Sequence, residues 1–411
     1  MNRLLDSFCR YARVDTMAAE GAKTYPSSPG QLELGRLLAE ELRQMGAMEV
    51  EQTAEGIVFA TIPASAGVIA QTIALIAHVD TSPETSGHGV KPVVHAPYDG
   101  GDISYPAVPG LVLSPSKDPE LARLKGATII TSDGTTLLGA DDKAGVAVIM
   151  EAARRLLETP ALPRPRIRIC FTCDEEIGRG TDHVDLGKLG AKVAYTLDGG
   201  GTGEIDAATF SADLATVCVR GVNIHPSIAK GRMINAVRLA ALFIDRLPRQ
   251  FLSAETTEDD QGFLHPYRIE GGVEEVRVQI LLRDFRTEAL AEQARMLREI
   301  AGHLQCEFPG SRIEVNTRAQ YRNMADGLAA EPRAVALAEA ATRRAGVVPR
   351  VTRVRGGTDG SRFTEKGLPC PNLSCGEHNP HSPLEWTCLE EMDAACRVLV
   401  ELAGCWAAEC G

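Results

Sequence analysis

Three apolar runs along the chain are typical of β-strands that are buried on both faces. They cover residues 72–80, 166–174 and 193–198. Between the first and second runs, residues 142–158 are rich in Ala, Val, Ile and Leu, which predicts a helix. Strands that alternate with helices predict an α/β fold with a doubly wound, mostly parallel sheet. Residues 81–136 are rich in Gly, Pro, Ser and Asp, and predict a long surface excursion.

From about residue 211 the order of the predicted elements changes to β-α-β-β-α-β. The six elements are predicted at residues 214–219, 234–247, 262–269, 276–283, 288–304 and 312–317. This order is that of a ferredoxin-like unit. Because the α/β pattern resumes after residue 325, we predict an α/β domain in two parts, residues 1–210 and 325–411, that is interrupted by an inserted domain, residues 211–324.

Composition and charge narrow the class of protein. The chain has 411 residues, enough for two or three domains of roughly 150 residues each. Its 44% hydrophobic and 24% charged residues are ordinary for a globular protein. A formal net charge of −12 argues against a nucleic-acid partner and against an anionic membrane, because both select basic surfaces. No apolar run approaches the roughly 20 residues that a membrane span needs.

The N-terminal segment and the cysteines indicate the compartment. Residues 1–13 predict a short amphipathic helix and lack the pattern of an export signal. The 11 cysteines are scattered without the spacing of a disulfide framework, so we expect reduced thiols. Both observations favour a cytoplasmic protein.

Each of the three apolar runs ends in acids or a histidine. The first ends in His78-Val-Asp80, the second in Asp174-Glu-Glu176 and the third in Asp198-Gly-Gly. Ligands of open α/β sheets bind outside the carboxyl ends of the strands. Carboxylates that converge there would repel one another unless cations lay among them. Carboxylate and imidazole donors suit zinc, manganese or cobalt.

Taken singly, each of these motifs has a structural explanation. His78 alone would be a core histidine, and Asp174-Glu-Glu176 a solvated charge run. Asp141 alone would be a helix N-cap, followed by an exposed Asp142-Lys143 ion pair. Asp198-Gly-Gly alone would be a turn. Three strand ends with the same unusual chemistry favour a common metal site instead.

These segments also resemble the motifs of a known family. The motifs are His78-Val-Asp80, Leu137-Leu-Gly-Ala-Asp-Asp-Lys-Ala-Gly145, Asp174-Glu-Glu-Ile-Gly178 and Tyr195-Thr-Leu-Asp-Gly-Gly200. They are similar to the metal-site motifs of the peptidase T family of tripeptide aminopeptidases, co-catalytic metallopeptidases related to glutamate carboxypeptidases and aminoacylases. The resemblance covers nearly the whole chain and continues through His225-Pro, Ala229-Lys-Gly231, Arg283-Asp-Phe285 and Arg355-Gly-Gly-Thr-Asp-Gly360.

The resemblance implies a catalytic α/β domain, an inserted lid and two divalent metal ions, with Zn²⁺ the expected metal. One ion would be held by His78, Asp141 and Asp198. The other would be held by Asp141, Glu176 and His381, so that Asp141 bridges the two.

The resemblance also implies roles for residues around the metals. Asp80 would orient the imidazole of His78, and residues 78 and 80 of a strand do share a face. Glu175 would be the general base. The lid would supply His225 as a donor to the tetrahedral oxyanion and Arg283 as a donor to a substrate carboxylate. Arg283 lies on an alternating strand, so it could instead be a solvated side chain.

The C-terminal segment departs from the family's pattern. The family usually surrounds its last metal histidine with a sequence close to Gly-Gly-x-Asn-x-His-Gly, whereas residues 375–383 read Cys-Gly-Glu-His-Asn-Pro-His-Ser-Pro. The Asn-x-His match selects His381, and His378 remains a competitor. Because Pro380 biases the residue before it towards an extended backbone, we expect the two histidines to point in different directions. Glu377 and Pro380 alter a wall that is expected to touch substrate.

The expected function is a metal-dependent aminopeptidase that acts on short peptides, tripeptides among them. One alternative is an N-acyl amino-acid amidohydrolase of the same fold, which needs no pocket for a free α-amino group. A second is a non-catalytic metal-dependent binding protein, although the intact Glu175 weighs against it. A third is a thiol redox protein, which only Cys170 and Cys173 suggest. The sequence leaves open whether the chain is a monomer or a homodimer.

Overall fold

The chain folds into two compact units. The computed structural model describes residues 2–105 and 107–409. The first unit contains the residues up to 207, residues 324–353 and the residues from 358 onward. The second unit contains residues 208–323 and 354–357.

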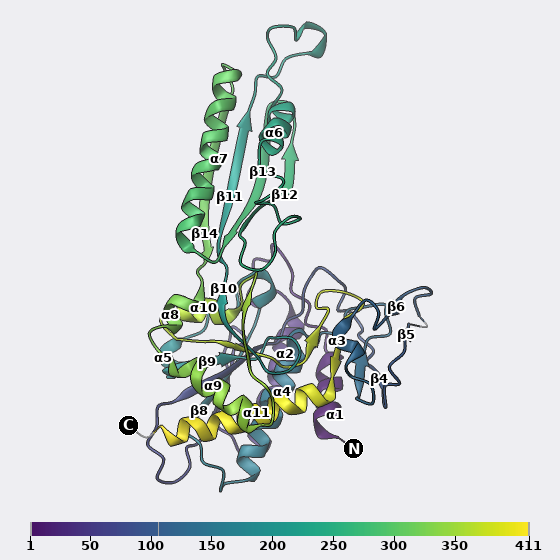
Figure 1. Ribbon diagram of the computed structural model, residues 1–411, viewed down its shortest axis with the longest axis vertical. Coiled ribbons are helices and arrows are strands. Elements are labelled where there is room, and N and C mark those ends of the chain that lie inside the picture. The colour runs from purple at the N-terminus through teal and green to yellow at the C-terminus, as the bar shows by residue number, and fades with distance from the viewer. Residues whose placement is uncertain (1, 106, 410–411) are drawn as a thin grey trace. The chain divides into compact units, whose positions relative to one another are not determined.

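The first unit is built on an eight-stranded sheet (Figure 1). Its strands, in spatial order, are β1 (Met48–Gln52), β2 (Val58–Ile62), β8 (Ile167–Thr172), β3 (Ile73–His78), β9 (Val193–Thr196), β16 (Asn372–Leu373), β10 (Glu204–Thr209) and β15 (Arg350–Val354). The four central strands, β8, β3, β9 and β16, run parallel. Antiparallel pairs flank them on both sides. The carboxyl ends of β8, β3 and β9 therefore lie next to one another.

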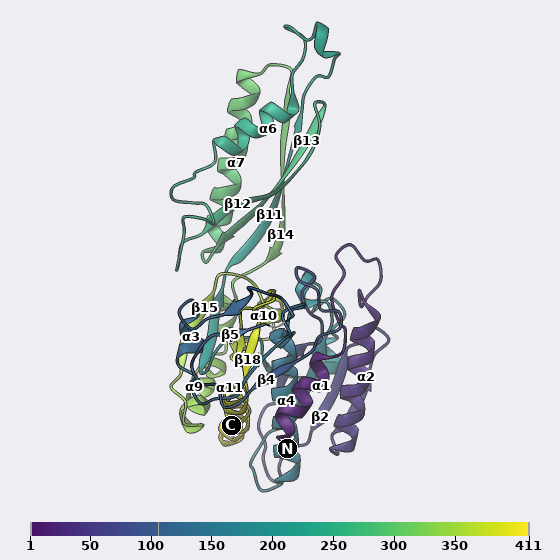
Figure 2. The same cartoon turned by 90° about the vertical axis from the view of Figure 1, so that its right-hand side faces the viewer.

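Helices cover both faces of this sheet. One face carries α1 (Arg3–Ala12), α2 (Pro29–Gln44), α4 (Ala140–Glu158), α8 (Met324–Leu328), α9 (Arg333–Arg344) and α11 (Leu389–Ala408). Figure 2 shows α1, α4 and α11 packed together on this face. The other face carries α5 (Leu186–Leu189) and α10 (Asp359–Glu365). Leu75 of β3 packs into the first layer and Ile76 into the second, so the predicted doubly wound α/β fold is confirmed.

Residues 81–136 form more than a surface excursion, and the sequence-based expectation is wrong in this respect. Their strands β4 (Val93–His95) and β7 (Ile129–Thr131) join the C-terminal strands β17 (Glu377–His378) and β18 (Trp386–Cys388) in a second sheet. The segment also contains β5 (Ile103–Ser104), β6 (Val112–Leu113) and α3 (Pro119–Ala122). Tyr98, Tyr105 and Leu121 are buried with Trp386 in an apolar cluster of their own. The expectation failed because this core is completed by residues far along the chain.

The second unit has the predicted β-α-β-β-α-β order. Its elements are β11 (Ser211–Arg220), α6 (Ala236–Asp245), β12 (Phe263–Gly271), β13 (Glu275–Asp284), α7 (Thr287–Glu307) and β14 (Arg312–Tyr321). The strands form an antiparallel sheet in the order β12-β13-β11-β14, and α6 and α7 pack on it. Its core is separate from that of the first unit. Among the described residues of the whole chain, no helix is both long and apolar enough to cross a membrane.

Cys170 and Cys173, which form a C-x-x-C sequence and suggest the redox alternative, are structural in this fold. Cys170 packs into the apolar layer with α5 and α10, whereas Cys173 packs into the layer on the opposite face. Both thiols are free and fully buried. Burial raises the pKa of each thiol. Redox-active thiols need a low pKa and solvent access, so the redox interpretation lacks support.

Candidate metal centre

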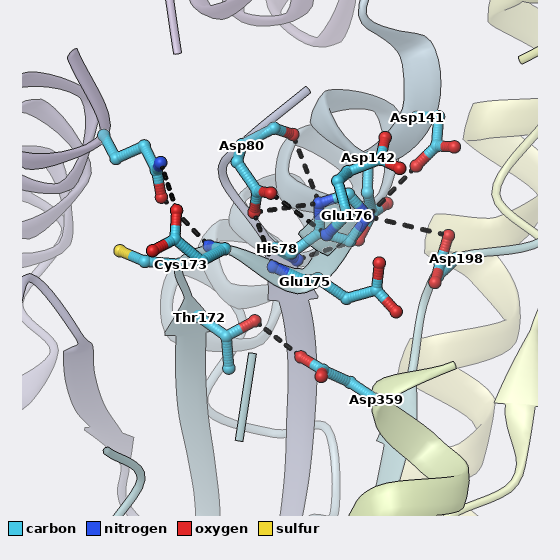
Figure 3. Close-up of polar contacts among 12 residues, drawn as sticks. His78, Asp80, Asp141, Asp142, Thr172, Cys173, Glu175, Glu176, Asp198 and Asp359 are labelled. Atoms are coloured by element: carbon cyan, nitrogen blue, oxygen red, sulfur yellow. Dashed lines mark hydrogen bonds and ion pairs between the residues drawn. The ribbon is translucent and has the colours of Figure 1, made fainter. Parts of the chain in front are cut away.

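The acidic strand ends meet at one edge of the large sheet. His78 is the last residue of β3, Asp174 follows shortly after β8, and Asp198 follows β9. Because β8, β3 and β9 are adjacent and parallel, the side chains that follow them converge (Figure 3). This is the edge at which ligands of open α/β sheets bind.

Asp141 lies between two imidazoles. Its Oδ1 is 3.0 Å from His78 Nε2, and its Oδ2 is 3.2 Å from His381 Nε2. Each imidazole also faces a second carboxylate. His78 Nε2 lies 3.8 Å from Asp198 Oδ1, and His381 Nε2 lies 2.9 Å from Glu176 Oε2. The five residues therefore form two donor groups that share Asp141.

Glu385 holds the segment that carries Asp141. Its Oε2 accepts hydrogen bonds from the backbone N–H groups of Leu138 and Gly139, both at 2.7 Å, and its Oε1 accepts one from Asp141 at 3.0 Å. The backbone of Asp141 is not yet helical (φ −78°, ψ 103°), so the helix itself offers these N–H groups no acceptor. Glu385 is fully buried. Sequence reasoning missed it, because a single acid in an irregular segment has no diagnostic spacing.

Asp142, and not Asp141, caps the regular part of helix α4, which begins after the non-helical backbone of Asp141 and Asp142. Asp142 Oδ1 accepts a hydrogen bond from the N–H of Gly145 at 3.1 Å, and its Oδ2 accepts one from the backbone N–H of His78 at 3.0 Å. Lys143 is buried as well and donates to the carbonyl oxygen of Val14 at 2.8 Å. The alternative of an Asp141 cap followed by an exposed Asp142-Lys143 ion pair is therefore wrong. Asp142 takes over the capping, and Asp141 faces the imidazoles.

Asp80 joins the histidine of one strand end to the acids of another. His78 Nδ1 lies 3.2 Å from the backbone carbonyl oxygen of Asp80 and 3.4 Å from its Oδ1. The two carboxylate oxygens of Asp80 accept hydrogen bonds from the backbone N–H groups of Glu175 and Glu176, each at 3.1 Å. Asp80 thus contacts the His78 ring on the side away from Nε2 and fixes the 3-10 turn Glu175–Ile177.

The three acids after β8 face different surroundings. Asp174 is buried and accepts hydrogen bonds from Ser27 and from Gln31 Nε2, so it is committed to the start of α2. Glu176 reaches His381. The carboxylate of Glu175 lies on the same side of the site as those of Asp198 and Asp359 (Figure 3).

The two C-terminal histidines have different partners. His381 Nε2 faces Asp141 and Glu176, as given above. His378 is buried, stacks on Trp386 with ring centroids 3.7 Å apart, and its Nε2 lies 2.6 Å from Glu391 Oε2. The expectation that Asn379 is extended is wrong, because its φ is +52°, in the left-handed region that asparagine tolerates.

The carboxylates hold protons on the imidazoles. Asp141 and Glu176 raise the pKa of the His381 imidazole to about 11. Burial alone would lower the pKa of His78, but Asp141 and Asp198 raise it well above its ordinary value. Burial raises the pKa of Glu176 to about 8. Positive charge is therefore stabilised at both imidazoles, at the places where a divalent cation would replace the protons.

Buried polar atoms in both donor groups fit a pair of cations. His78 Nε2 and Asp141 Oδ1 lie 3.0 Å apart and have no well-aligned hydrogen bond to the described residues, and Glu176 Oε1 has no hydrogen-bond partner among them. Buried polar atoms are otherwise almost always paired. Imidazole nitrogen and carboxylate oxygen are the donors that Zn²⁺ and its neighbours take in catalytic sites. The donor set therefore fits divalent cations.

The remaining two expected site residues lie in the second unit. His225 is exposed, and its Nδ1 lies 2.7 Å from Ser227 Oγ. Arg283 is buried rather than solvated, and its Nη1 donates to the carbonyl oxygens of Leu282 and Asp213. Its guanidinium lies over the ring of Tyr321, 5.4 Å from the centroid. These contacts hold the Arg283 side chain in one position.

Comparison with known proteins agrees with this architecture. The model of peptidase family M20/M25/M40 matches residues 133–404, and the model of peptidase family M28 matches residues 58–199. The chain belongs to peptidase family M20/M25/M40, a conclusion that its similarity to individual members supports.

Individual members of the family are similar to this chain over nearly its whole length. Peptidase T of Geobacillus kaustophilus (strain HTA426) is 42% identical over 399 residues, which are 97% of this chain and 97% of that protein. The crystal structure of the aminopeptidase PepT from Bacillus cereus ATCC 10987 superposes with a TM-score of 0.77 at 26% identity and covers 98% of both chains. A dinuclear metal-binding peptidase of the M20 family from Bacillus subtilis shares the fold, with a TM-score of 0.65 at 16% identity over 98% of this chain and 97% of its own.

Because Glu385 holds the backbone that carries Asp141, its replacement should weaken metal binding. Glu385→Gln places an amide N–H group where a carboxylate oxygen accepts backbone N–H bonds, so the Asp141 segment should shift. We expect metal affinity to fall by about 10–100-fold, the range for partners that orient metal ligands. Titration of the metal-free protein measures it. Glu390→Gln is the matched control, because Glu390 also accepts a backbone N–H bond, from Thr128 at 2.8 Å. Equal affinities in the two variants would contradict the assigned role.

Proposed function

We propose that this chain is a metal-dependent aminopeptidase that removes the N-terminal residue from short peptides, tripeptides among them. The observation that carries the proposal is the position of Asp141, whose two carboxylate oxygens face the buried imidazole of His78 and the partly exposed imidazole of His381. The 42% identity to a Peptidase T over nearly the whole chain supports the substrate class.

Two divalent cations, which we expect to be Zn²⁺, would occupy the two donor groups. His78, Asp141 and Asp198 would hold one, and Asp141, Glu176 and His381 the other. The buried polar atoms in both groups support this assignment. When bound, two such cations make a water molecule nucleophilic at neutral pH and polarise the scissile carbonyl.

Asp80 is proposed to position two groups at once. Its contact with His78 Nδ1 leaves Nε2 directed at Asp141 and Asp198. Its carboxylate accepts hydrogen bonds from the backbone N–H groups of Glu175 and Glu176, which fixes the position of the turn after β8 relative to the His78 ring. Such partners restrict the orientation of the groups that bind metal and substrate.

Glu175 is the proposed general base. Burial raises the pKa of its carboxyl group well above the ordinary value, and the carboxylate of Asp359 adds to the shift. Positive charge nearby would lower the pKa again, towards the range in which a carboxyl group both accepts and releases a proton near neutral pH. Glu175 would take the proton of the attacking water and pass it to the leaving amine, a role worth about 10²–10⁴-fold in rate.

Two groups of the second unit are proposed to bind substrate. The exposed imidazole of His225 can donate a hydrogen bond to the oxyanion of the tetrahedral intermediate. The guanidinium of Arg283, held over Tyr321, suits the carboxylate of a short peptide.

Substrate profiling tests the proposed function against its alternatives. The panel contains di-, tri- and tetrapeptides with free amino groups, the same peptides N-acetylated, and N-acyl amino acids. We expect cleavage of free tripeptides at the first peptide bond and little cleavage of the acetylated series. Preference for N-acyl amino acids would favour the amidohydrolase instead. Binding of peptides without cleavage would favour a binding protein.

Metal removal should abolish activity. We expect about two divalent ions per chain by elemental analysis, and loss of activity in a chelator that is reversed by added metal. Because His78 and His381 must release protons to bind metal, affinity should rise with pH. Full activity in a preparation without metal would exclude this account of the site.

Replacement of the proposed base should separate chemistry from metal binding. Glu175→Gln keeps the shape of the side chain but cannot take a proton, so kcat should fall by at least about 10²-fold with both ions retained. Steady-state kinetics and metal analysis of the same sample measure this. A near-normal kcat would move the base elsewhere, whereas loss of metal would exchange the roles of Glu175 and Glu176.

The two C-terminal histidines should respond differently to alanine. His381→Ala should lose one ion and most activity, because its Nε2 faces Asp141 and Glu176. His378→Ala should keep both ions and change mainly KM or peptide preference, because its ring lies between Trp386 and Glu391. Metal counts and steady-state kinetics on both variants show which of the two histidines binds metal. The reverse outcome, with depletion only in His378→Ala, would show that the wrong histidine has been assigned.

A further inference from the structure

Glu377 lies in the wall of the candidate metal centre. The segment before it runs against the turn that carries Asp198, since the N–H of Cys375 donates to the carbonyl oxygen of Gly199 at 2.8 Å and Gly200 forms a β-bridge with Glu377. Glu377 is 7% exposed. This placement directs a buried carboxylate towards residues of the site.

The Glu377 carboxylate is close to two proposed metal ligands. One of its oxygens lies within 4.8 Å of carboxylate oxygens of both Asp141 and Asp198. Its Oε1 lies 2.9 Å from Cys375 Sγ, whose thiol can donate a hydrogen bond to it. Among the described residues, no lysine, arginine or histidine forms an ion pair with Glu377. Three ionised carboxylates so close together repel one another, and a cation among them would remove that repulsion.

A second observation points to a ligand at the same place. His78 is 3% exposed, and among the described residues its Nε2 has only carboxylate oxygens as close polar neighbours, at distances of 3.0 and 3.8 Å. This nitrogen faces Asp141 and Asp198, the two residues that Glu377 approaches. The His78 imidazole and the Glu377 carboxylate thus both approach Asp141 and Asp198.

We propose that Glu377 supplies an additional carboxylate oxygen to the cation held by His78, Asp141 and Asp198. The inference rests on the two-cation site of the proposed function. An added anionic oxygen favours hard cations over softer ones, so Glu377 shifts the preference of this position towards Mn²⁺ relative to Zn²⁺. Glycine, the usual residue at this place in the resembling family, has no side-chain oxygen to offer.

Metal titration of the metal-free protein tests the proposal. Glu377→Gln should weaken the binding of one Mn²⁺ by at least about 10-fold, the lower end of the range for lost metal-site partners, and the binding of Zn²⁺ by less. The visible spectrum of the Co²⁺-loaded variant should change, because one oxygen donor is lost. Glu391→Gln is the matched control, because Glu391 is equally buried in the same part of the chain but bonds His378. It should bind both metals as the unmodified protein does.

The outcomes separate this inference from the proposed function. If the unmodified protein binds two ions and Glu377→Gln changes neither the affinities nor the Co²⁺ spectrum, Glu377 is a structural acid bonded to Cys375 and the inference is wrong. If the unmodified protein binds no ion, the proposed function itself fails. Circular dichroism shows whether Glu377→Gln folds. If Glu377→Gln does not fold, Glu377→Asp takes its place, because aspartate keeps the charge but has a shorter side chain. Weakened Mn²⁺ binding in Glu377→Asp supports the inference, and unchanged binding overturns it.

Discussion

The structure depends on how it accommodates the mutual repulsion of carboxylates that meet at one edge of the large sheet. Two like charges 4 Å apart repel by about 4 kcal/mol at an effective dielectric constant of 20. Asp141, Asp198 and Glu377 present oxygens within 4.8 Å of one another, so their charges must be offset by protons or by cations. Without cations, protonated imidazoles offset part of the negative charge: Asp141 and Glu176 raise the pKa of His381 to about 11. Divalent cations offset the repulsion more fully and couple metal binding to the stability of the site.

Much of the first unit keeps these groups from moving apart. The parallel strands β8, β3 and β9 set the spacing of the acids, because their carboxyl ends are adjacent. Asp80 ties the His78 ring to the turn after β8, and Glu385 anchors the segment of Asp141 from the opposite end of the chain. Asp142 caps α4 and so leaves Asp141 to face two imidazoles. A rigid arrangement of ligands limits reorganisation when metal and substrate bind.

The sequence was informative wherever function follows from local pattern. Buried parallel strands appear as continuous apolar runs, so the strand ends and their acids could be located. It was uninformative where contacts join distant segments. Glu385 bonds Asp141 across 244 positions, and the second sheet forms only when residues 93–95 and 129–131 meet the C-terminal strands. The left-handed backbone of Asn379 overrides the bias from the following proline. The three acids after β8 look alike in sequence, and only their neighbours distinguish them.

The central claim is that Asp141 is shared by two cations. A crystal structure of the metal-loaded protein with anomalous diffraction data at the absorption edge of the bound metal tests this most directly. The account predicts two anomalous peaks about 3.5–4 Å apart, the spacing of two-metal sites, each within bonding distance of a different oxygen of Asp141. A single peak, or two peaks of which only one touches Asp141, would contradict it.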